Sequence, residues 1–148
     1  MSHSINLTPL GGHVLHASEE KTFSQGLQQT IRVLHVEDTE FIRSATGDII
    51  KDLKGVYTGA STGEEAFRIY TPDGFDIVIM DMELGPGING YETARRIRQI
   101  NPHQLIYSCS SKQVHESEAL FSGNIPKEGI RRFLQEKISQ GQGNKKSQ

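Results

Sequence analysis

The stretch FDIVIMD, residues 75–81, decides the fold of this 148-residue chain. Such an almost unbroken apolar run is typical of a strand buried on both faces, which belongs in the middle of a parallel sheet covered by helices on both sides. The run ends in the carboxylate of Asp81, and the next residues, MELGPGING (82–90), have the Gly and Pro content of a loop. We therefore expect Asp81 at the carboxyl edge of the sheet, where α/β proteins bind ligands, unless it only caps the next element.

Composition and charge exclude several classes of protein. The chain has 16 Lys and Arg against 18 Asp and Glu, so it lacks the basic excess of a nucleic-acid-binding surface. No stretch is long and apolar enough to span a bilayer, residues 1–6 do not resemble a secretory signal, and the single Cys109 excludes an internal disulfide. We expect a cytoplasmic protein that binds neither nucleic acid nor membranes.

Strand and helix patterns alternate on both sides of the central stretch. Besides 75–81, short β-rich runs predict strands at 31–36, 56–60, 105–109 and 124–126. Apolar residues at helical spacing predict helices at 39–54, 91–100, 113–121 and 129–138. A further helix is predicted to begin directly after the capping motif of residues 61–65. Because each right-handed crossover returns the chain to the same edge, the strands should be parallel.

Five such units predict an α/β fold, namely a flavodoxin-like doubly wound five-stranded parallel sheet of order 2-1-3-4-5 with a short fourth helix. This domain would occupy residues 30–138. We interpret residues 1–29 as a partly ordered N-terminal extension and the polar residues 139–148 as a disordered tail.

Three carboxylates should meet at one edge of this sheet. The first and third strands are neighbours in the predicted order, so Glu37 and Asp38, which follow the first strand, should lie near Asp81. Two negative charges about 4 Å apart repel by about 4 kcal/mol at an effective dielectric near 20, so the three must bind protons or a cation. Oxygen ligands without Cys or His favour Mg²⁺. The alternative is that Glu37 and Asp38 only cap the first helix.

Ser110 and Lys127 follow the fourth and fifth strands, and the same topology brings them to this edge. A hydroxyl, an ammonium group and a divalent cation around one carboxylate form a cradle for a tetrahedral anion, as phosphoryl transfer requires. Taken singly, Ser110 is as readily a loop serine and Lys127 a solvated surface charge. Their shared position favours the cradle.

The chain closely resembles the receiver domain of two-component response regulators, in particular the stand-alone chemotaxis or phosphorelay type. The resemblance covers residues 32–138 and rests on an ordered set of landmarks, none of which is specific alone. The landmarks are VED (36–38), STGEEA (61–66), DIVIMD (76–81), Gly90, CSS (109–111) and Pro126-Lys127.

The resemblance implies that Asp81 accepts a phosphoryl group from the phosphohistidine of a sensor histidine kinase or a histidine phosphotransfer protein. Asp38 and Asp81 would bind Mg²⁺ directly, with Glu37 binding directly or through water. The backbone carbonyl of Glu83 would add a further ligand. Phosphorylation would then switch the binding of a downstream protein, which the sequence does not identify.

The resemblance also implies which groups bind the phosphoryl group. Ser110 matches the switch Ser or Thr that bonds a phosphoryl oxygen. Lys127 matches the lysine that pairs with Asp81 before transfer and with the phosphoryl group after it. Glu83 and Lys112 stand at positions that tune how fast water removes the phosphoryl group.

Four features depart from the family pattern. Gly90 lies nine positions after the expected phosphoacceptor where eight is usual, and the Ser and Lys landmarks lie 17 positions apart, several fewer than usual. Asn124 stands where many receivers carry Tyr or Phe, and Glu128 replaces a common proline. These changes leave the chemistry intact. They alter the face built from the fourth helix, fifth strand and fifth helix, which carries the signal in the family.

Three functions stay open. The first is a phosphoacceptor that acts alone, since nothing after residue 138 would form an output domain, and that catalyses only its own phosphorylation and dephosphorylation. The second is a receiver-like interaction module whose output does not depend on phosphorylation. The third is a hydrolase of the haloacid dehalogenase type, which carries its nucleophile after the first strand with an Asp two positions on. Here Asp81 follows the third strand, and Glu83 comes two positions later.

Overall fold

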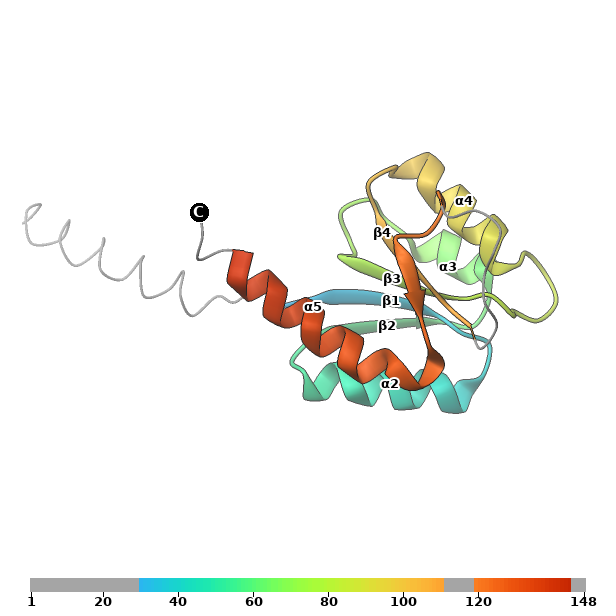
Figure 1. Ribbon diagram of the computed structural model, residues 1–148. Coiled ribbons are helices and arrows are strands. Elements are labelled where there is room, and N and C mark those ends of the chain that lie inside the picture. The colour runs from blue at the N-terminus through green and yellow to red at the C-terminus, as the bar shows by residue number, and fades with distance from the viewer. Residues whose placement is uncertain (1–29, 111–118, 145–148) are drawn as a thin grey trace, which may run out of the picture.

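The computed structural model describes residues 30–110 and 119–144. Five parallel strands form one sheet in the order β2-β1-β3-β4-β5 (Figure 1). The strands are β1 (Arg32–Val36), β2 (Val56–Ala60), β3 (Ile77–Asp81), β4 (Leu105–Cys109) and β5 (Gly123–Ile125). The prediction of a flavodoxin-like doubly wound sheet is confirmed.

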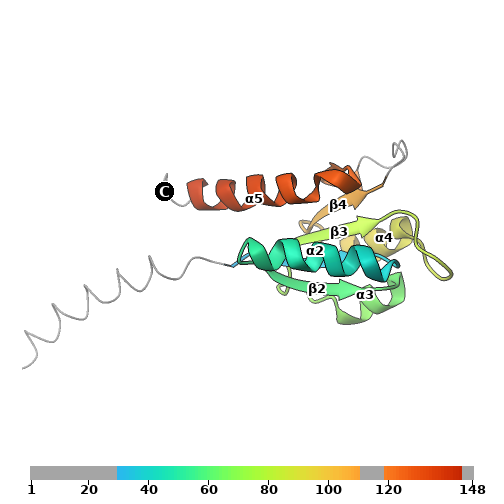
Figure 2. The same cartoon turned by 90° about the horizontal axis from the view of Figure 1, so that it is seen from below.

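Helices cover both faces of the sheet. On one face lie α2 (Glu40–Asp52) and α5 (Ile130–Asn144), and on the other lie α3 (Gly63–Ile69) and α4 (Gly90–Ile100) (Figures 1 and 2). A turn of 3-10 helix, η1 (Lys127–Gly129), leads into α5. Residues 113–118 of the predicted short fourth helix, 113–121, lie outside the described residues, and residues 119–121 are not helical. Within the described ranges, no helix is both long and apolar enough to cross a membrane.

Each face of the sheet has its own apolar core. Burying one large aliphatic side chain contributes about 1.5–3 kcal/mol, so these two cores fix the strands firmly. All five residues of β3 are buried, as expected for the central strand. The core under α2 and α5 includes Val33, Ile50, Ile79 and Leu134, and the core under α3 and α4 includes Leu34, Ala66, Val78 and Ile97.

The central strand begins two residues later than predicted, at Ile77. The carboxylate of Asp76 instead accepts a hydrogen bond from the Arg32 amide at 2.8 Å and pairs with the Arg32 guanidinium at 3.1 Å. Asp76 therefore links the residues just before β3 to the first residue of β1, at the amino-terminal end of the two strands.

The prediction that the last helix ends at residue 138 and that a disordered tail follows is wrong for residues 139–144. Helix α5 continues to Asn144, and its C-terminal part extends beyond the sheet (Figure 2). Residues 139–144 contain no proline, and adding a residue to an existing helix costs far less than starting one. Polarity alone therefore did not mark the end of the helix.

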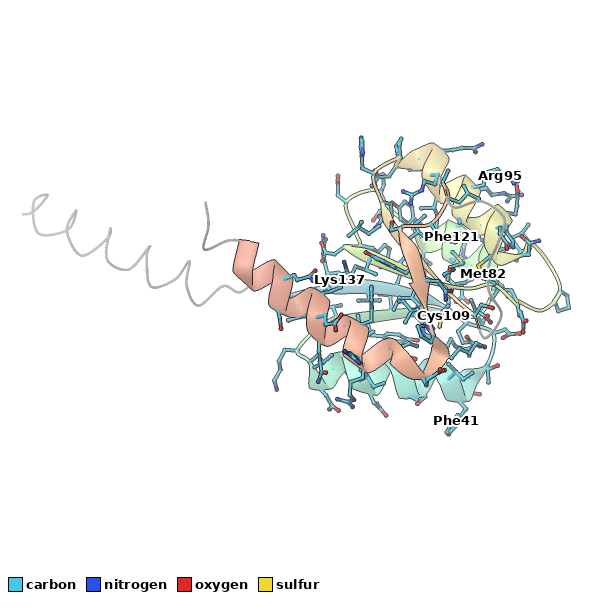
Figure 3. The ribbon with its side chains drawn as sticks, in the orientation of Figure 1. Phe41, Met82, Arg95, Cys109, Phe121 and Lys137 are labelled. Atoms are coloured by element: carbon cyan, nitrogen blue, oxygen red, sulfur yellow. The ribbon has the colours of Figure 1, made fainter. Side chains whose placement is uncertain are left out.

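Among the described residues, Phe41 is the most exposed of the large apolar side chains. Phe41, in the first turn of α2, is 81% exposed and points away from the sheet (Figure 3). It lies three positions after Asp38, at the end of α2 beside the carboxyl edge of the sheet.

Candidate functional site

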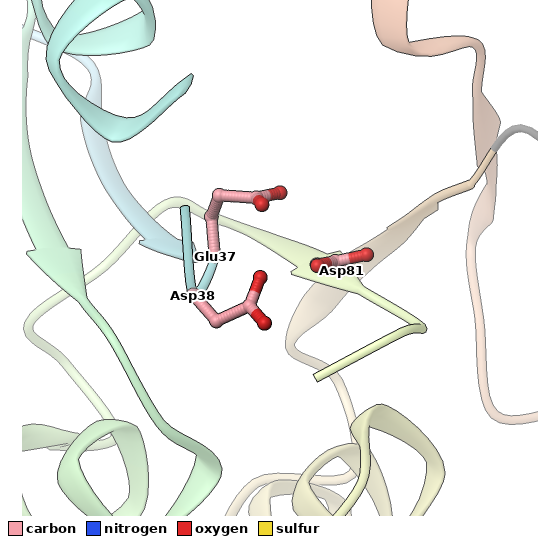
Figure 4. Close-up of side chains that lie close together, drawn as sticks. All are labelled: Glu37, Asp38 and Asp81. Atoms are coloured by element: carbon pink, nitrogen blue, oxygen red, sulfur yellow. The ribbon is translucent and has the colours of Figure 1, made fainter. Parts of the chain in front are cut away.

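The ends of β1 and β3 bring three carboxylates together, as predicted. The two strands are paired up to Val36 and Met80, so the residues that follow lie side by side. Ligand oxygens of Glu37, Asp38 and Asp81 all lie within 4.8 Å of one another (Figure 4). Glu37 and Asp81 are each 1% exposed, whereas Asp38 faces solvent.

This cluster disfavours negative charge on Glu37. Burial, and after it the charge of Asp81, raises the pKa of the Glu37 carboxyl to about 7. The amide of Thr39, which donates to Glu37 Oε1 over 3.3 Å, only partly offsets this rise in pKa. A divalent cation would compensate the same charges, and three carboxylates without Cys or His are a ligand set that fits Mg²⁺.

Lys127 places a positive charge next to Asp81. Its Nζ lies 3.9 Å from Asp81 Oδ1, and its side chain is 32% exposed. Lys127 is the first residue of η1, directly after β5, so the predicted convergence of these two residues is observed. No described peptide bond is cis, so the bond from Lys127 to Glu128 is trans.

Ser110 reaches the same edge through β4. Cys109, the last residue of that strand, pairs with Asp81 in register, and Ser110 follows at 6% exposure. Burial raises the pKa of the Cys109 thiol to about 12, so this neighbour of Asp81 stays protonated at neutral pH. Lys112 lies outside the described residues.

The loop after Asp81 passes over the acidic cluster. The amide of Glu83 donates to Asp81 Oδ1 over 3.0 Å and so orients the carboxylate. A Cβ on Gly85 would lie 3.6 Å from Asp38 Oδ2, which places the loop against the second carboxylate.

Gly90 ends this longer loop without disturbing the site. A Cβ at this position would lie 2.5 Å from the Asp81 carbonyl oxygen, so only glycine allows the chain to return this closely. Asn89 then caps α4 by accepting a hydrogen bond from the Glu92 amide at 2.9 Å. The extra residue is therefore accommodated before α4 begins.

Two supporting residues were not identified from the sequence. Arg43 on α2 donates to the Glu37 carbonyl oxygen over 2.7 Å. His35, buried in β1, contacts the Tyr57 hydroxyl through Nδ1 at 3.1 Å, and burial lowers its pKa to about 4. A histidine inside an apolar strand was the one signal for His35, and the sequence held none for Arg43.

Taken together, this edge of the sheet brings three carboxylates that could bind a cation close to an ammonium group. Solved structures with the same fold fit this arrangement. TrrA from Thermotoga maritima in complex with Mg²⁺-BeF is 26% identical, with a TM-score of 0.66 over 76% of this chain and 99% of that chain. CheY4 of Vibrio cholerae, 22% identical with a TM-score of 0.64, covers 72% of this chain and 98% of that chain and supports the fold alone. The class is thus a receiver-type α/β signalling protein.

The family follows from the sequence comparison. Residues 33–142 match the response regulator receiver domain, and the chain belongs to this family. It is similar to the chemotaxis protein CheY of Thermotoga maritima, 36% identical over 95 residues, which are 62% of this chain and 78% of that protein. It is also similar to the response regulator UvrY of Escherichia coli, 41% identical over 69 residues, which are 45% of this chain and 31% of that protein. The chain therefore spans about a third of UvrY, and the resemblance to receiver domains is confirmed.

Proposed function

We propose that this chain is a phosphoacceptor in two-component or phosphorelay signalling, and that Asp81 is the acceptor. The observation that carries the proposal is the environment of Asp81, a buried carboxylate clustered with Glu37 and Asp38 and lying 3.9 Å from the Lys127 ammonium nitrogen. Burying an isolated carboxylate would cost free energy, because the charge loses its hydration. A carboxylate beside a cation site and an ammonium group is suited to a reaction that adds a negatively charged phosphoryl group to it.

In the proposed reaction, a carboxylate oxygen of Asp81 attacks the phosphorus of a phosphohistidine. An O–P bond forms and the N–P bond breaks, with the electron pair leaving on the imidazole nitrogen. The Glu83 amide holds Asp81 Oδ1 during the attack. Lys127 and Ser110 bind the oxygens of the transferred group, because both lie at the same edge of the sheet. Glu83 and Lys112 set how easily water reaches the product.

We assign the cation site to Asp38 and Asp81, with Glu37 binding directly or through water and the Glu83 carbonyl as a further ligand. When bound, Mg²⁺ would neutralise negative charge that develops on the phosphoryl oxygens. The ligand set of this chain supports the assignment, and so does its similarity to TrrA, which was solved in complex with Mg²⁺-BeF.

The proposed phosphodonor is a sensor histidine kinase or a histidine phosphotransfer protein, and phosphorylation of Asp81 changes the affinity for a downstream protein. Family membership supports both partners. The chain catalyses only the gain and loss of its own phosphoryl group.

The test is incubation with Mg²⁺ and acetyl phosphate followed by intact mass measurement. We expect one phosphoryl adduct on the parent chain and none on Asp81→Asn, with the two proteins melting at similar temperatures. An adduct that persists in Asp81→Asn would contradict the assignment. Steady release of phosphate from many unrelated monoesters would indicate a hydrolase instead.

One observation favours a second function, a receiver-like interaction module that works without phosphorylation. The exposed Asn124 on β5 accepts a hydrogen bond from the Ser108 hydroxyl at 2.9 Å, where many receivers carry an aromatic ring. A polar bond between β4 and β5 at this position would hold the signalling face in one state. Absence of any adduct on the parent chain would favour this function.

A further inference from the structure

The loop of residues 82–89 is fastened at both ends. At its start, the Glu83 amide donates to Asp81 Oδ1 over 3.0 Å. At its end, the amide of Ile88 donates to Oε1 of Glu64, in the first turn of α3, over 2.8 Å. The loop therefore connects the phosphorylation site with a helix that contributes no residue to that site.

The Glu64 carboxylate occupies the space beside Gly87. A Cβ on Gly87 would lie 2.5 Å from Glu64 Oε1 and 2.8 Å from Oε2. Gly87 also has a φ of +109°, a conformation that L side chains rarely adopt. The backbone conformation therefore favours glycine here, and an added Cβ would push the Glu64 carboxylate out of its place.

The charge of Glu64 matches this contact. The hydrogen bond from the Ile88 amide lowers the pKa of Glu64, and the charge of Arg96 adds to the effect. Glu64 is thus ionised at neutral pH, and hydrogen bonds to an ionised acceptor are stronger than those to a neutral one.

The middle of the loop lies where a shift would reach the cation site. Gly85 approaches Asp38, since its Cβ would lie 3.6 Å from Asp38 Oδ2. Met82 and Leu84 pack against the core under α3 and α4, so the loop rests on the same layer that carries Glu64. The backbone from residue 83 to residue 88 is therefore held both by this packing and by the bond from Ile88 to Glu64.

We propose that Glu64 is a positioning residue for the phosphorylation site, which it serves by fastening loop 82–89 so that the Glu83 backbone is held at the cation ligands. This inference rests on the proposed function, because it concerns Mg²⁺ binding at the same site. Glu64 acts through the loop backbone.

The neighbouring Glu65 supplies a matched control. Its Oε2 accepts hydrogen bonds from the amide and the hydroxyl of Ser61 at 2.8 and 2.9 Å, and its amide donates to the Thr62 hydroxyl at 3.0 Å. These bonds cap α3 and are separate from the loop. Glu65→Ala should therefore destabilise the helix without releasing Ile88.

The experiment compares the parent chain with Glu64→Ala, Glu64→Gln and Glu65→Ala by amide hydrogen exchange and by calorimetric titration with Mg²⁺. In Glu64→Ala we expect the Ile88 amide to exchange at least about tenfold faster and Mg²⁺ affinity to fall roughly threefold. Glu64→Gln should lie between the parent and Glu64→Ala, because its amide oxygen still accepts the bond but carries no negative charge. Glu65→Ala should lower the melting temperature and leave both other readings unchanged.

A second variant approaches the contact from the loop. Gly87→Ala should also speed exchange at Ile88 and lower Mg²⁺ affinity, because an added Cβ would displace the Glu64 carboxylate and would strain the backbone at its φ of +109°. An unchanged exchange rate of the Ile88 amide in Glu64→Ala would overturn the inference. Faster exchange in Glu64→Ala with the Mg²⁺ affinity of the parent chain would also overturn it. So would a loss of Mg²⁺ affinity in Glu65→Ala equal to that in Glu64→Ala. A parent chain that binds no Mg²⁺ and forms no acetyl phosphate adduct would instead overturn the proposed function.

Discussion

Lys127 lies 3.9 Å from Asp81, with its ammonium nitrogen facing the same carboxylate oxygen that accepts the Glu83 amide. This distance is longer than a hydrogen bond. Because the Lys127 side chain is long and partly exposed, its ammonium group can pair with the Asp81 carboxylate and can shift to a charged group that becomes attached to it. The pair therefore has a geometry suited to both states of a phosphoacceptor.

Replacing Lys127 tests this relationship. We expect Lys127→Ala to slow adduct formation from acetyl phosphate at least about tenfold, because a positive charge aimed at the developing anion is lost. The measurement is a time course of intact mass. Lys137→Ala is the control, since Lys137, on α5, places its Nζ over the Tyr107 ring of β4, 5.3 Å from the ring centroid. Equal rates in the two variants would contradict the role of Lys127.

Removing one carboxylate tests the cation site. We expect Asp38→Ala to weaken Mg²⁺ binding about 100-fold, because a charged oxygen ligand is lost. Without Mg²⁺ the same change should not lower the melting temperature, since it relieves repulsion within the acidic cluster. Calorimetric titration and thermal melts measure both effects, with the exposed Asp48→Ala on α2 as control. Unchanged affinity in Asp38→Ala would exclude this site.

The raised pKa of Glu37, about 7, predicts how pH acts on the metal-free chain. Between the usual carboxyl pKa, near 4.5, and 7, the folded chain binds more protons than the unfolded chain, so its stability should fall as pH rises through this window. Because Mg²⁺ must displace that proton, its affinity should rise with pH by up to about tenfold per unit below pH 7.

Glu37→Gln isolates this effect, because the amide keeps the size of the side chain and does not titrate. Melting temperatures and Mg²⁺ titrations between pH 5 and pH 8 should depend less on pH in this variant than in the parent. If the pH dependence is the same in both proteins, another group is responsible.

Phe41 predicts where the phosphodonor protein makes contact. An aromatic ring that is 81% exposed beside the proposed phosphorylation site is suited to pack against the proposed phosphodonor protein, which would have to bring its histidine to Asp81. We expect Phe41→Ala to slow transfer from a purified histidine phosphotransfer protein about tenfold and to leave the reaction with acetyl phosphate unchanged. Val56→Ala, at the opposite end of the sheet and 50% exposed, is the control. Equal slowing with both donors would argue for a defect in the site itself.

The strand order and the acidic cluster were predictable because they depend on local patterns. The apolar run that ends at Asp81 and the short run before Glu37 each fix one strand, and the handedness of the crossovers then fixes their neighbours. Lys127 followed from the same rule, since it comes directly after the last strand. None of these inferences needed the path of a loop.

The contacts that the sequence did not predict depend on how far single side chains reach or on the paths of loops. The bond from Arg43 to the Glu37 carbonyl joins a side chain to a backbone oxygen. The sequence pattern does not distinguish Arg43 from any other long polar residue on that face of α2. Likewise, the motif at 61–65 indicated a helix cap but not that Glu64 would reach Ile88. That bond depends on how a glycine-rich loop turns, which residue spacing does not determine.

The burial of Cys109 gives the protein a natural reporter. The chain has a single thiol, which is 2% exposed and lies on β4 directly before Ser110. A thiol reagent reaches Cys109 when β4 opens locally. The labelling rate of the native protein therefore reports how often that strand opens. Attaching a phosphoryl group to Asp81 should change the labelling rate of Cys109, and measuring this rate needs no engineered probe.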